Sequence, residues 1–337
     1  MTDQNYGSNQ PAVREVIAVL GCYRGGTSAV ARMLPVMGVS LVGKMLAPSG
    51  YNPTGFWENE DILELNLALV QCAGMREFYP NLDAHAVMSS AEYPTLLASG
   101  AGILESSFAQ TPAVGFKHPG TSRLLFFWQE VFRQTNTKDS YLIALRHPGA
   151  TADSLRSNFH LRIELGLFLW LEHLIGAVQY THDRPRVIVG YELLLAQPRQ
   201  QVLRVATALR REEQINLTDV DKFVDGFIDK SLQHSESGTQ RTQRIIDRFP
   251  VVMEVYRLMQ ARAADQIPEL QFQSEFRALA RRFEQEIADI FHRYPWLSDQ
   301  RLNKISRAEV LWFRLRHEGL RSTLRRIAEH GGKSTRH

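Results

Sequence analysis

The stretch from Val16 to Leu34, "VIAVLGCYRGGTSAVARML", constrains the fold of this chain more than any other feature of its sequence. It begins with an apolar run of the kind found in strands that are covered on both faces. Glycines follow, and then a helical pattern starts. Such a turn leaves several backbone N–H groups pointing the same way, beside the positive end of the helix dipole. The stretch therefore predicts an anion-binding loop between a strand and a helix.

The side chains of this loop differ from those of a nucleotide triphosphatase. There, a lysine follows the second glycine, whereas Thr27 stands at that position here. Gly25 and Gly26 allow a close approach of the backbone. Thr27 and Ser28 add hydroxyl donors, and Arg24 adds a guanidinium that suits an oxyanion. We expect these residues to bind a phosphate or sulfate group; the alternative is a plain strand–turn–helix junction whose glycines serve packing.

The chain up to about residue 240 alternates strand and helix patterns. Four β-branched, nearly continuous apolar runs are predicted strands: 16–20, 113–116, 141–145 and 186–191. Helical patterns between them are predicted helices: 26–37, 58–71 and 161–179. This alternation predicts an α/β fold, in which a parallel central sheet is flanked by helices as in P-loop nucleotide-binding proteins.

Beyond about residue 240 the patterns are helical only, so we expect a helical C-terminal extension. Apolar residues recur at helical spacing over 276–291, and the chain from 301 onward is basic with interleaved apolar residues. The expected organisation has three parts: a flexible N-terminus over 1–14, an α/β domain over 15–295 and a basic helical tail over 296–337. The tail either packs on the chain's own core, contacts a partner or lies on an anionic membrane surface.

Composition narrows the functional classes. The net charge of +3 on 337 residues is too small to indicate nucleic-acid binding. Two cysteines, Cys22 and Cys72, exclude a disulfide framework and suit a reducing compartment. The first residues lack the apolar core of a signal peptide, and the apolar run over 165–178 is too short to span a bilayer. We therefore expect a cytoplasmic protein with no membrane span and no nucleic-acid partner.

A second anion site is predicted where a later strand ends. The run "YLIALRHP" ends in Arg146 and His147, and not in an acidic Mg²⁺ ligand. Ser154 follows Arg146 by eight residues, across a Pro–Gly turn and a helix start. Both side chains can then reach one phosphate at the carboxyl rim of a parallel sheet. Two phosphate sites without a metal site indicate a nucleotide that is phosphorylated at two places.

Five segments, in this order between residues 16 and 234, resemble motifs of the sulfotransferases that use 3′-phosphoadenosine-5′-phosphosulfate (PAPS). They are "GCYRGGTSAVARML", "NPTGFWEN" (52–59), "GFKHP" (115–119), "LRHPGATADSL" and "VGYELLLAQP" (189–198). The bacterial, carbohydrate and tyrosyl-protein branches are the most similar. Two positions depart from the pattern: His118 stands where aspartate is usual, and Asn158 where the tyrosyl-protein branch has a second arginine.

The resemblance implies roles for the donor site. Arg24 and the amides of residues 25–28 would hold the 5′-phosphosulfate, and Lys117 would contact the bridging oxygen of the leaving group. Arg146 and Ser154 would hold the 3′-phosphate, and Tyr191 matches a nucleotide-contacting tyrosine. Lys230, Ser231 and His234 lie in a segment that resembles a loop closing over the nucleotide.

An acceptor hydroxyl needs a base near the sulfur atom. Glu58, in "NPTGFWEN", is our first candidate; its alternative role is that of a carboxylate favoured at a helix N-terminus. His118 and His147 are the next candidates, and a buried structural histidine is the alternative for each.

The sequence thus predicts a PAPS-dependent sulfotransferase that works by in-line displacement, without a metal ion, on an acceptor hydroxyl of a glycan or small molecule. Residues 81–108 are expected to line the acceptor pocket. Two other functions compete. One is a small-molecule or nucleotide kinase of similar fold, which would need Mg²⁺ and ATP. The other is a nucleotide-binding scaffold without catalytic activity.

Overall fold

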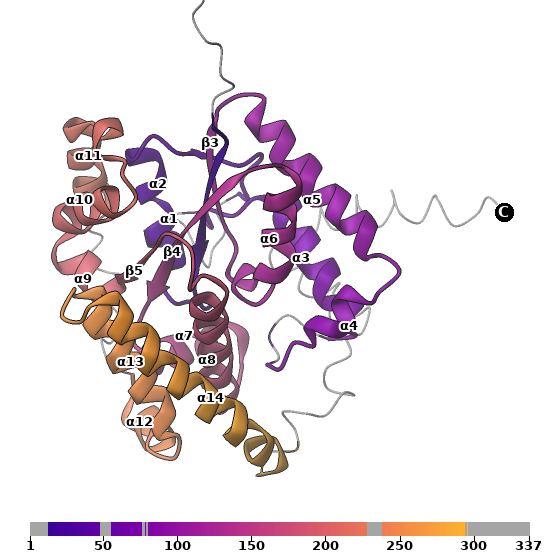
Figure 1. Cartoon of the computed structure of the whole chain (residues 1–337). Helices are drawn as coiled ribbons and strands as arrows, with labels where there is room; N and C mark the ends of the chain where they lie inside the picture. The colour runs from indigo at the N-terminus through magenta and orange to yellow at the C-terminus, as the bar shows by residue number, and fades with distance from the viewer. Residues whose placement is uncertain are drawn as a thin grey trace, which may run out of the picture.

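A parallel sheet runs through the centre of the molecule (Figure 1). The computed structural model describes residues 13–47, 55–75, 78, 80–227, 238–293 and 295. Its strands are β1 (Glu15–Leu20), β2 (Ser40–Leu41), β3 (Ala113–Lys117), β4 (Lys138–Leu145) and β5 (Arg186–Gly190). All neighbours pair in parallel, in the order β2-β3-β1-β4-β5. The predicted α/β class is confirmed, and the four predicted strands are present.

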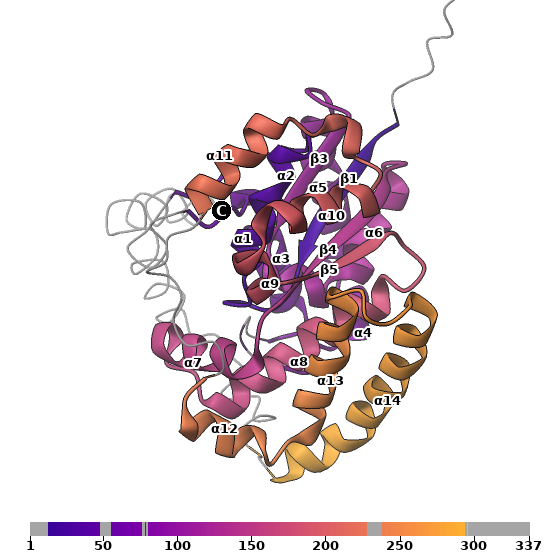
Figure 2. The same ribbon diagram turned by 90° about the vertical axis from the view of Figure 1, so that its left-hand side faces the viewer.

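Helices cover both faces of the sheet. On β1, Ile17 and Val19 point into one apolar layer, whereas Val16, Ala18 and Leu20 point into the other. The first layer is closed by α1 (Thr27–Ala31), α2 (Met33–Val36), α10 (Pro198–Ala208) and α11 (Leu217–Phe227). The second is closed by α3 (Glu60–Cys72), α5 (Tyr93–Phe108), α6 (Leu125–Gln134), α8 (Ile163–Tyr180), α13 (Pro250–Ala263) and α14 (Glu269–Arg293). Figure 1 shows α10 and α11 on one side of the sheet and α5 and α6 on the other, and in Figure 2 the side that carries α10 and α11 faces the viewer.

Short helices connect these layers to the rim of the sheet. They are α4 (Ala84–Met88), the 3-10 turn η1 (Pro119–Arg123), α7 (Pro148–Phe159), α9 (Tyr191–Ala196), η2 (Glu212–Gln214) and α12 (Gln240–Ile246). In the part of the chain described after residue 237, every regular element is a helix, as the sequence predicted. No helix among the described residues is long and apolar enough to cross a bilayer.

Three local differences from the sequence prediction matter for the site. The predicted helix over 26–37 is interrupted at Arg32, where α1 gives way to α2. Pro35 lies inside this stretch and cannot donate a backbone hydrogen bond. The predicted helix over 58–71 begins later, because the Asn59 side chain accepts the Ile62 N–H at 2.8 Å and caps it. Glu58 therefore lies just before α3. The strand β2, of two residues, was not predicted.

The connections define one special point on the sheet. The chain leaves β1 towards β2 and β3, but it leaves the neighbouring β4 towards β5. In open parallel sheets, ligands bind outside the carboxyl ends of strands at such a switch point. The loop over 21–26 and the turn at 146–148 lie there. The tail over 296–337, most of the N-terminus over 1–14, and Lys230, Ser231 and His234 fall outside the described residues.

Candidate functional site

The loop after β1 is held in a conformation that glycine alone suits at two positions. Gly21 has a φ of 135°, and a Cβ there would lie 2.8 Å from the Ala144 carbonyl oxygen. Gly26 has a φ of 86°, and a Cβ there would lie 2.6 Å from the ring of Tyr191. Gly26 is also the N-cap of α1, and no described side chain caps this helix. The first N–H groups of α1 therefore have no side-chain cap among the described residues, which is what an anion site at a helix start requires.

Arg24 connects the two predicted phosphate sites. Its backbone is in the left-handed region, with a φ of 61°. Its side-chain Nε donates to Ser154 Oγ at 3.0 Å, and its carbonyl oxygen accepts from Arg146 Nη1 at 3.0 Å. The structure therefore brings Arg24 together with Arg146 and Ser154, both of which are more than a hundred residues from it in sequence.

Arg146 lies in the turn after β4 and Ser154 lies on α7; because α7 already begins at Pro148, the Pro–Gly turn predicted between them is part of the helix. The indole of Trp170, on α8, donates to the carbonyl of Arg146 at 3.0 Å. The guanidinium of Arg146 lies 5.0 Å from the ring centroid of Tyr191, at the start of α9. Asn158, which stands where the tyrosyl-protein branch has a second arginine, donates to the carbonyl of Ser154 at 2.8 Å. Trp170 carries no motif, so its role at this turn was not predictable from the sequence.

Electrostatics at this contact favour an anion. Burial lowers the pKa of Arg24, and the positive charge of Arg146 lowers it further, whereas Tyr191 has the opposite effect. Two guanidinium groups that disfavour each other are stabilised by a negative charge placed between them. The cluster therefore has the chemistry of an oxyanion site.

Lys117 and Glu58 form a second pair at the same rim. Lys117 ends β3, and its side chain is 2% exposed. Its Nζ donates to Glu58 Oε1 at 2.5 Å. Burial lowers the pKa of Lys117, the carboxylate of Glu58 raises it, and the charge of Arg24 lowers it again. The Ser28 hydroxyl donates to the Phe56 carbonyl at 3.1 Å and so ties the start of α1 to the segment that carries Glu58.

The hydrogen bonds of His118 give it a structural role. Trp128 Nε1 donates to Asn66 Oδ1 at 2.8 Å, and because an indole N–H only donates, this fixes the orientation of the amide. Asn66 Nδ2 is then the donor to His118 Nδ1 at 2.9 Å and to Thr121 Oγ1 at 3.0 Å. The neutral ring of His118, which is 1% exposed, therefore carries its proton on Nε2.

His147 is engaged in a similar way. Its Nδ1 accepts the N–H of Gly149 at 3.1 Å and caps α7. Burial lowers the pKa of His147, and the charge of Arg146 lowers it further, so the ring is neutral near pH 7. In both histidines the lone pair that could accept a proton already accepts a hydrogen bond. Glu58 is the better candidate base.

An aromatic cluster adjoins the loop and was not predicted. Tyr23, next to Arg24, meets Phe78 and His173 edge-on, with ring centroids 5.0 Å and 5.3 Å away. Phe78 lies 4.9 Å from Phe159, at the end of α7. Four separate segments supply these rings, which is why no sequence pattern revealed them.

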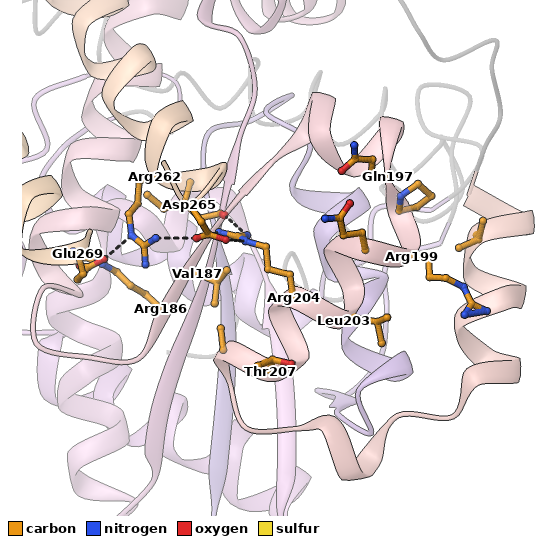
Figure 3. Close-up of a pocket in the computed structure, with 15 residues that line it drawn as sticks. Arg186, Val187, Gln197, Arg199, Leu203, Arg204, Thr207, Arg262, Asp265 and Glu269 are labelled. Carbon is orange, nitrogen blue, oxygen red and sulfur yellow. Dashed lines mark hydrogen bonds and ion pairs between the residues drawn. The ribbon is translucent and has the colours of Figure 1, made fainter. Parts of the chain in front are cut away.

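A cavity of about 990 Å³ lies elsewhere, along the outer edge of β5 (Figure 3). Its arginines meet carboxylates: Arg204 Nε lies 2.6 Å from Asp265, and Arg262 Nε lies 2.9 Å from Glu269. None of the residues predicted to act lines this cavity. We therefore place the candidate site at the rim. Among the described residues, no group of three or more His, Cys, Asp or Glu side chains is arranged to hold a metal ion.

Comparisons with known proteins are limited. No family model and no curated protein matches the chain. Among solved structures, it is similar to the sulfotransferase STF9 from Mycobacterium avium, at 14% identity and a TM-score of 0.42, over 71% of this chain and 76% of that one.

Two further similar structures are sulfotransferase domains, each at 14% identity. That of the curacin biosynthetic pathway has a TM-score of 0.35, over 71% of this chain and 98% of that one. That of the Synechococcus PCC 7002 olefin synthase has a TM-score of 0.36, over 74% and 98%. At these values the likeness decides nothing about the activity of this chain.

Proposed function

We propose that this chain transfers a sulfuryl group from PAPS to an acceptor hydroxyl. The observation that carries the proposal is the direct contact of Arg24 with both members of the Arg146–Ser154 pair. A nucleotide with phosphate groups at its 5′ and 3′ positions needs two anion sites a short distance apart. The loop after β1 and the turn after β4 supply two such sites on neighbouring strands.

The residues present fit this donor. The amides of residues 26–28 and the hydroxyl of Thr27 would hold the 5′-phosphosulfate, whereas the Gly25 N–H already donates to the Cys22 carbonyl at 2.9 Å and the Ser28 hydroxyl to the Phe56 carbonyl. Arg146 and Ser154 would hold the 3′-phosphate, and Tyr191 lies against the Arg146 guanidinium at the same place. Arg24 contacts both residues of the proposed 3′-phosphate site, because its side chain donates to Ser154 and its carbonyl oxygen accepts from Arg146.

The transfer step assigns one task to each remaining residue. The acceptor oxygen attacks sulfur, and the bond from sulfur to the 5′-phosphate oxygen breaks, releasing adenosine 3′,5′-bisphosphate. Glu58 takes the acceptor proton. Lys117 donates to the bridging oxygen as negative charge develops on it. The low pKa that burial gives Lys117 makes its ammonium a readier proton donor.

The acceptor is proposed to be a hydroxyl on a glycan or another small molecule. This part rests on the motif resemblance. A pocket lined by residues 81–108 stays a prediction. This segment is tied to α8, because the Leu82 N–H donates to Glu172 at 2.9 Å. The role of the basic tail also stays a prediction.

Calorimetry with three nucleotides tests the proposal. Adenosine 3′,5′-bisphosphate, ATP and adenosine 5′-phosphate are titrated with and without Mg²⁺. We expect the bisphosphate to bind most tightly and without Mg²⁺. A preference for ATP that depends on Mg²⁺ would instead identify a kinase. Bisphosphate binding without release of product from PAPS, over a panel of sugar hydroxyl acceptors, would identify a scaffold.

A further inference from the structure

A buried serine after β3 holds Gly21, the first residue of the loop over 21–26, which we call the phosphate loop. Ser122 belongs to η1 and is fully buried. Its Oγ accepts the N–H of Gly21 at 2.8 Å and donates to the carbonyl oxygen of Gly21 at 3.2 Å. One hydroxyl thus satisfies both backbone polar groups of Gly21, the residue that follows β1. No motif in the sequence singled out Ser122.

The sheet explains why Gly21 needs this partner. β1 pairs with β3 up to Val19 and Lys117, and the chain of β3 then turns away into η1. Gly21 lies beyond the last paired position, so β3 offers it no backbone partner. Buried backbone groups without partners are destabilising. The hydroxyl of Ser122 takes the place of the strand that has ended.

Ser122 is itself held firmly on both sides. On the α8 side, Gly176 approaches so closely that a Cβ there would lie 2.8 Å from the Ser122 carbonyl oxygen. On the other side, Thr121 accepts from the buried Asn66 at 3.0 Å. Gly120 packs against the Tyr23 hydroxyl, which a Cβ would meet at 2.9 Å. The short turn η1 is therefore a rigid support for the loop.

We propose that Ser122 is a positioning residue that fixes the phosphate loop relative to Lys117. The turn η1 begins two residues after Lys117, so one rigid segment carries both the predicted leaving-group contact and the hydroxyl that holds Gly21. The direction of the chain at Gly21 sets where the amides of residues 26–28 point. This inference rests on the proposed function, because it assigns the loop to the 5′-phosphosulfate.

The test compares two nucleotides that differ at the 5′ position only. Affinities for adenosine 3′,5′-bisphosphate and adenosine 3′-phosphate are measured by calorimetry in the parent and in Ser122→Ala. We expect the variant to bind the bisphosphate about tenfold more weakly, the effect of one or two lost hydrogen bonds. Its affinity for adenosine 3′-phosphate should fall less, because that nucleotide would meet the loop only through Arg24, which contacts Arg146 and Ser154. The ratio of the two affinities should therefore fall.

Thr135→Ala is the matched control. Thr135 also has a buried hydroxyl, which donates to the Val131 carbonyl at 3.0 Å. It lies between α6 and the first residue of β4, whereas the candidate site follows the last residue of β4. This variant should lower the melting temperature and leave the affinity ratio unchanged. A merely structural role for Ser122 predicts the same behaviour for Ser122→Ala.

The outcomes separate this inference from the function it rests on. A ratio in Ser122→Ala equal to that of the parent overturns the positioning role and leaves the proposed function standing. A parent that binds both nucleotides equally overturns the proposed function and the inference with it. If Ser122→Ala does not fold, Gly176→Ala displaces η1 while keeping the hydroxyl. It should lower the ratio in the same way, and an unchanged ratio counts against the proposal.

Discussion

Two groups of arginines on this molecule differ in what surrounds them. Along the edge of β5, Arg204 and Arg262 both pair with Asp265, and Figure 3 shows these side chains bridging one side of the cavity. At the rim, Arg24 meets a serine hydroxyl, and the charge of Arg146 opposes its own. The arginines of the first group are neutralised by carboxylates, whereas Arg24, in the second group, forms no ion pair with a described residue. The comparison teaches that a large cavity is a poorer guide to an anion site than the state of the charges.

The largest expected effect is on turnover, and it distinguishes the carboxylate of Glu58 at the rim from that of Glu269 at the β5 edge. Glu58→Gln should lower the turnover of PAPS by about 10²-fold or more, because the acceptor proton loses its base. Nucleotide affinity should stay as in the parent. Release of adenosine 3′,5′-bisphosphate in the presence of sugar hydroxyl acceptors measures the first, and calorimetry the second.

Glu269→Gln, at the β5 edge, is the control for Glu58→Gln. It removes an ion pair with Arg186 and should leave turnover unchanged. Equal losses in both variants, or no loss in Glu58→Gln, would move the base to another residue.

The next effect compares the arginines directly. Arg146→Ala should lower the affinity for adenosine 3′,5′-bisphosphate by about 10- to 100-fold, since hydrogen bonds to charged groups contribute about 1.5–3 kcal/mol. Adenosine 5′-phosphate should bind as it does to the parent, so the preference for a 3′-phosphate disappears. Arg204→Ala should retain that preference. If Arg146→Ala also retains it, the 3′-phosphate assignment is wrong.

The smallest effect concerns stability at the β5 edge. The hydrogen bond from Arg204 holds the pKa of Asp265 below its ordinary value of 3.8. The stabilisation is complete above that value and is lost as the pH falls through the folded-state pKa. Asp265 is more than half exposed, so solvent screening limits the contribution to about 1 kcal/mol. Asp265→Asn should therefore melt a few degrees below the parent at pH 7.

Acidification should remove this difference. Thermal melts of the parent and of Asp265→Asn should converge as the pH falls through the lowered pKa of Asp265, below which the carboxyl of the parent is protonated as well. A gap that persists there would show that packing, and not charge, connects α10 to the C-terminal helices.

The strands and the outline of the site were predictable because their signals are local. β-branched runs marked β1, β3, β4 and β5, and a glycine turn marked the loop. The short β2 carries too few residues for a pattern. The start of α3 depended on Asn59 as its cap, which shifted Glu58 out of the helix.

Contacts between distant segments were beyond the sequence. The bond from Arg24 to Ser154, the pairing of Lys117 with Glu58 and the support of Gly21 by Ser122 all depend on which strands become neighbours. Strand order follows from the packing of the whole core, and no single segment encodes it. The motif resemblance suggested which residues act together, but it gave no reason why Arg24 should touch Ser154.

The closeness of Gly26 to Tyr191 limits how this site can diversify. The ring of Tyr191 stands against the loop on one side and against the Arg146 guanidinium on the other. A methyl group added at Gly26 would displace the ring and disturb Arg146 through it. The loop and the turn after β4 both contact Tyr191, so a substitution that adapts one of them to a new anion would also require a change in the other. If the proposed function holds, a change in nucleotide preference would need paired substitutions in these two segments.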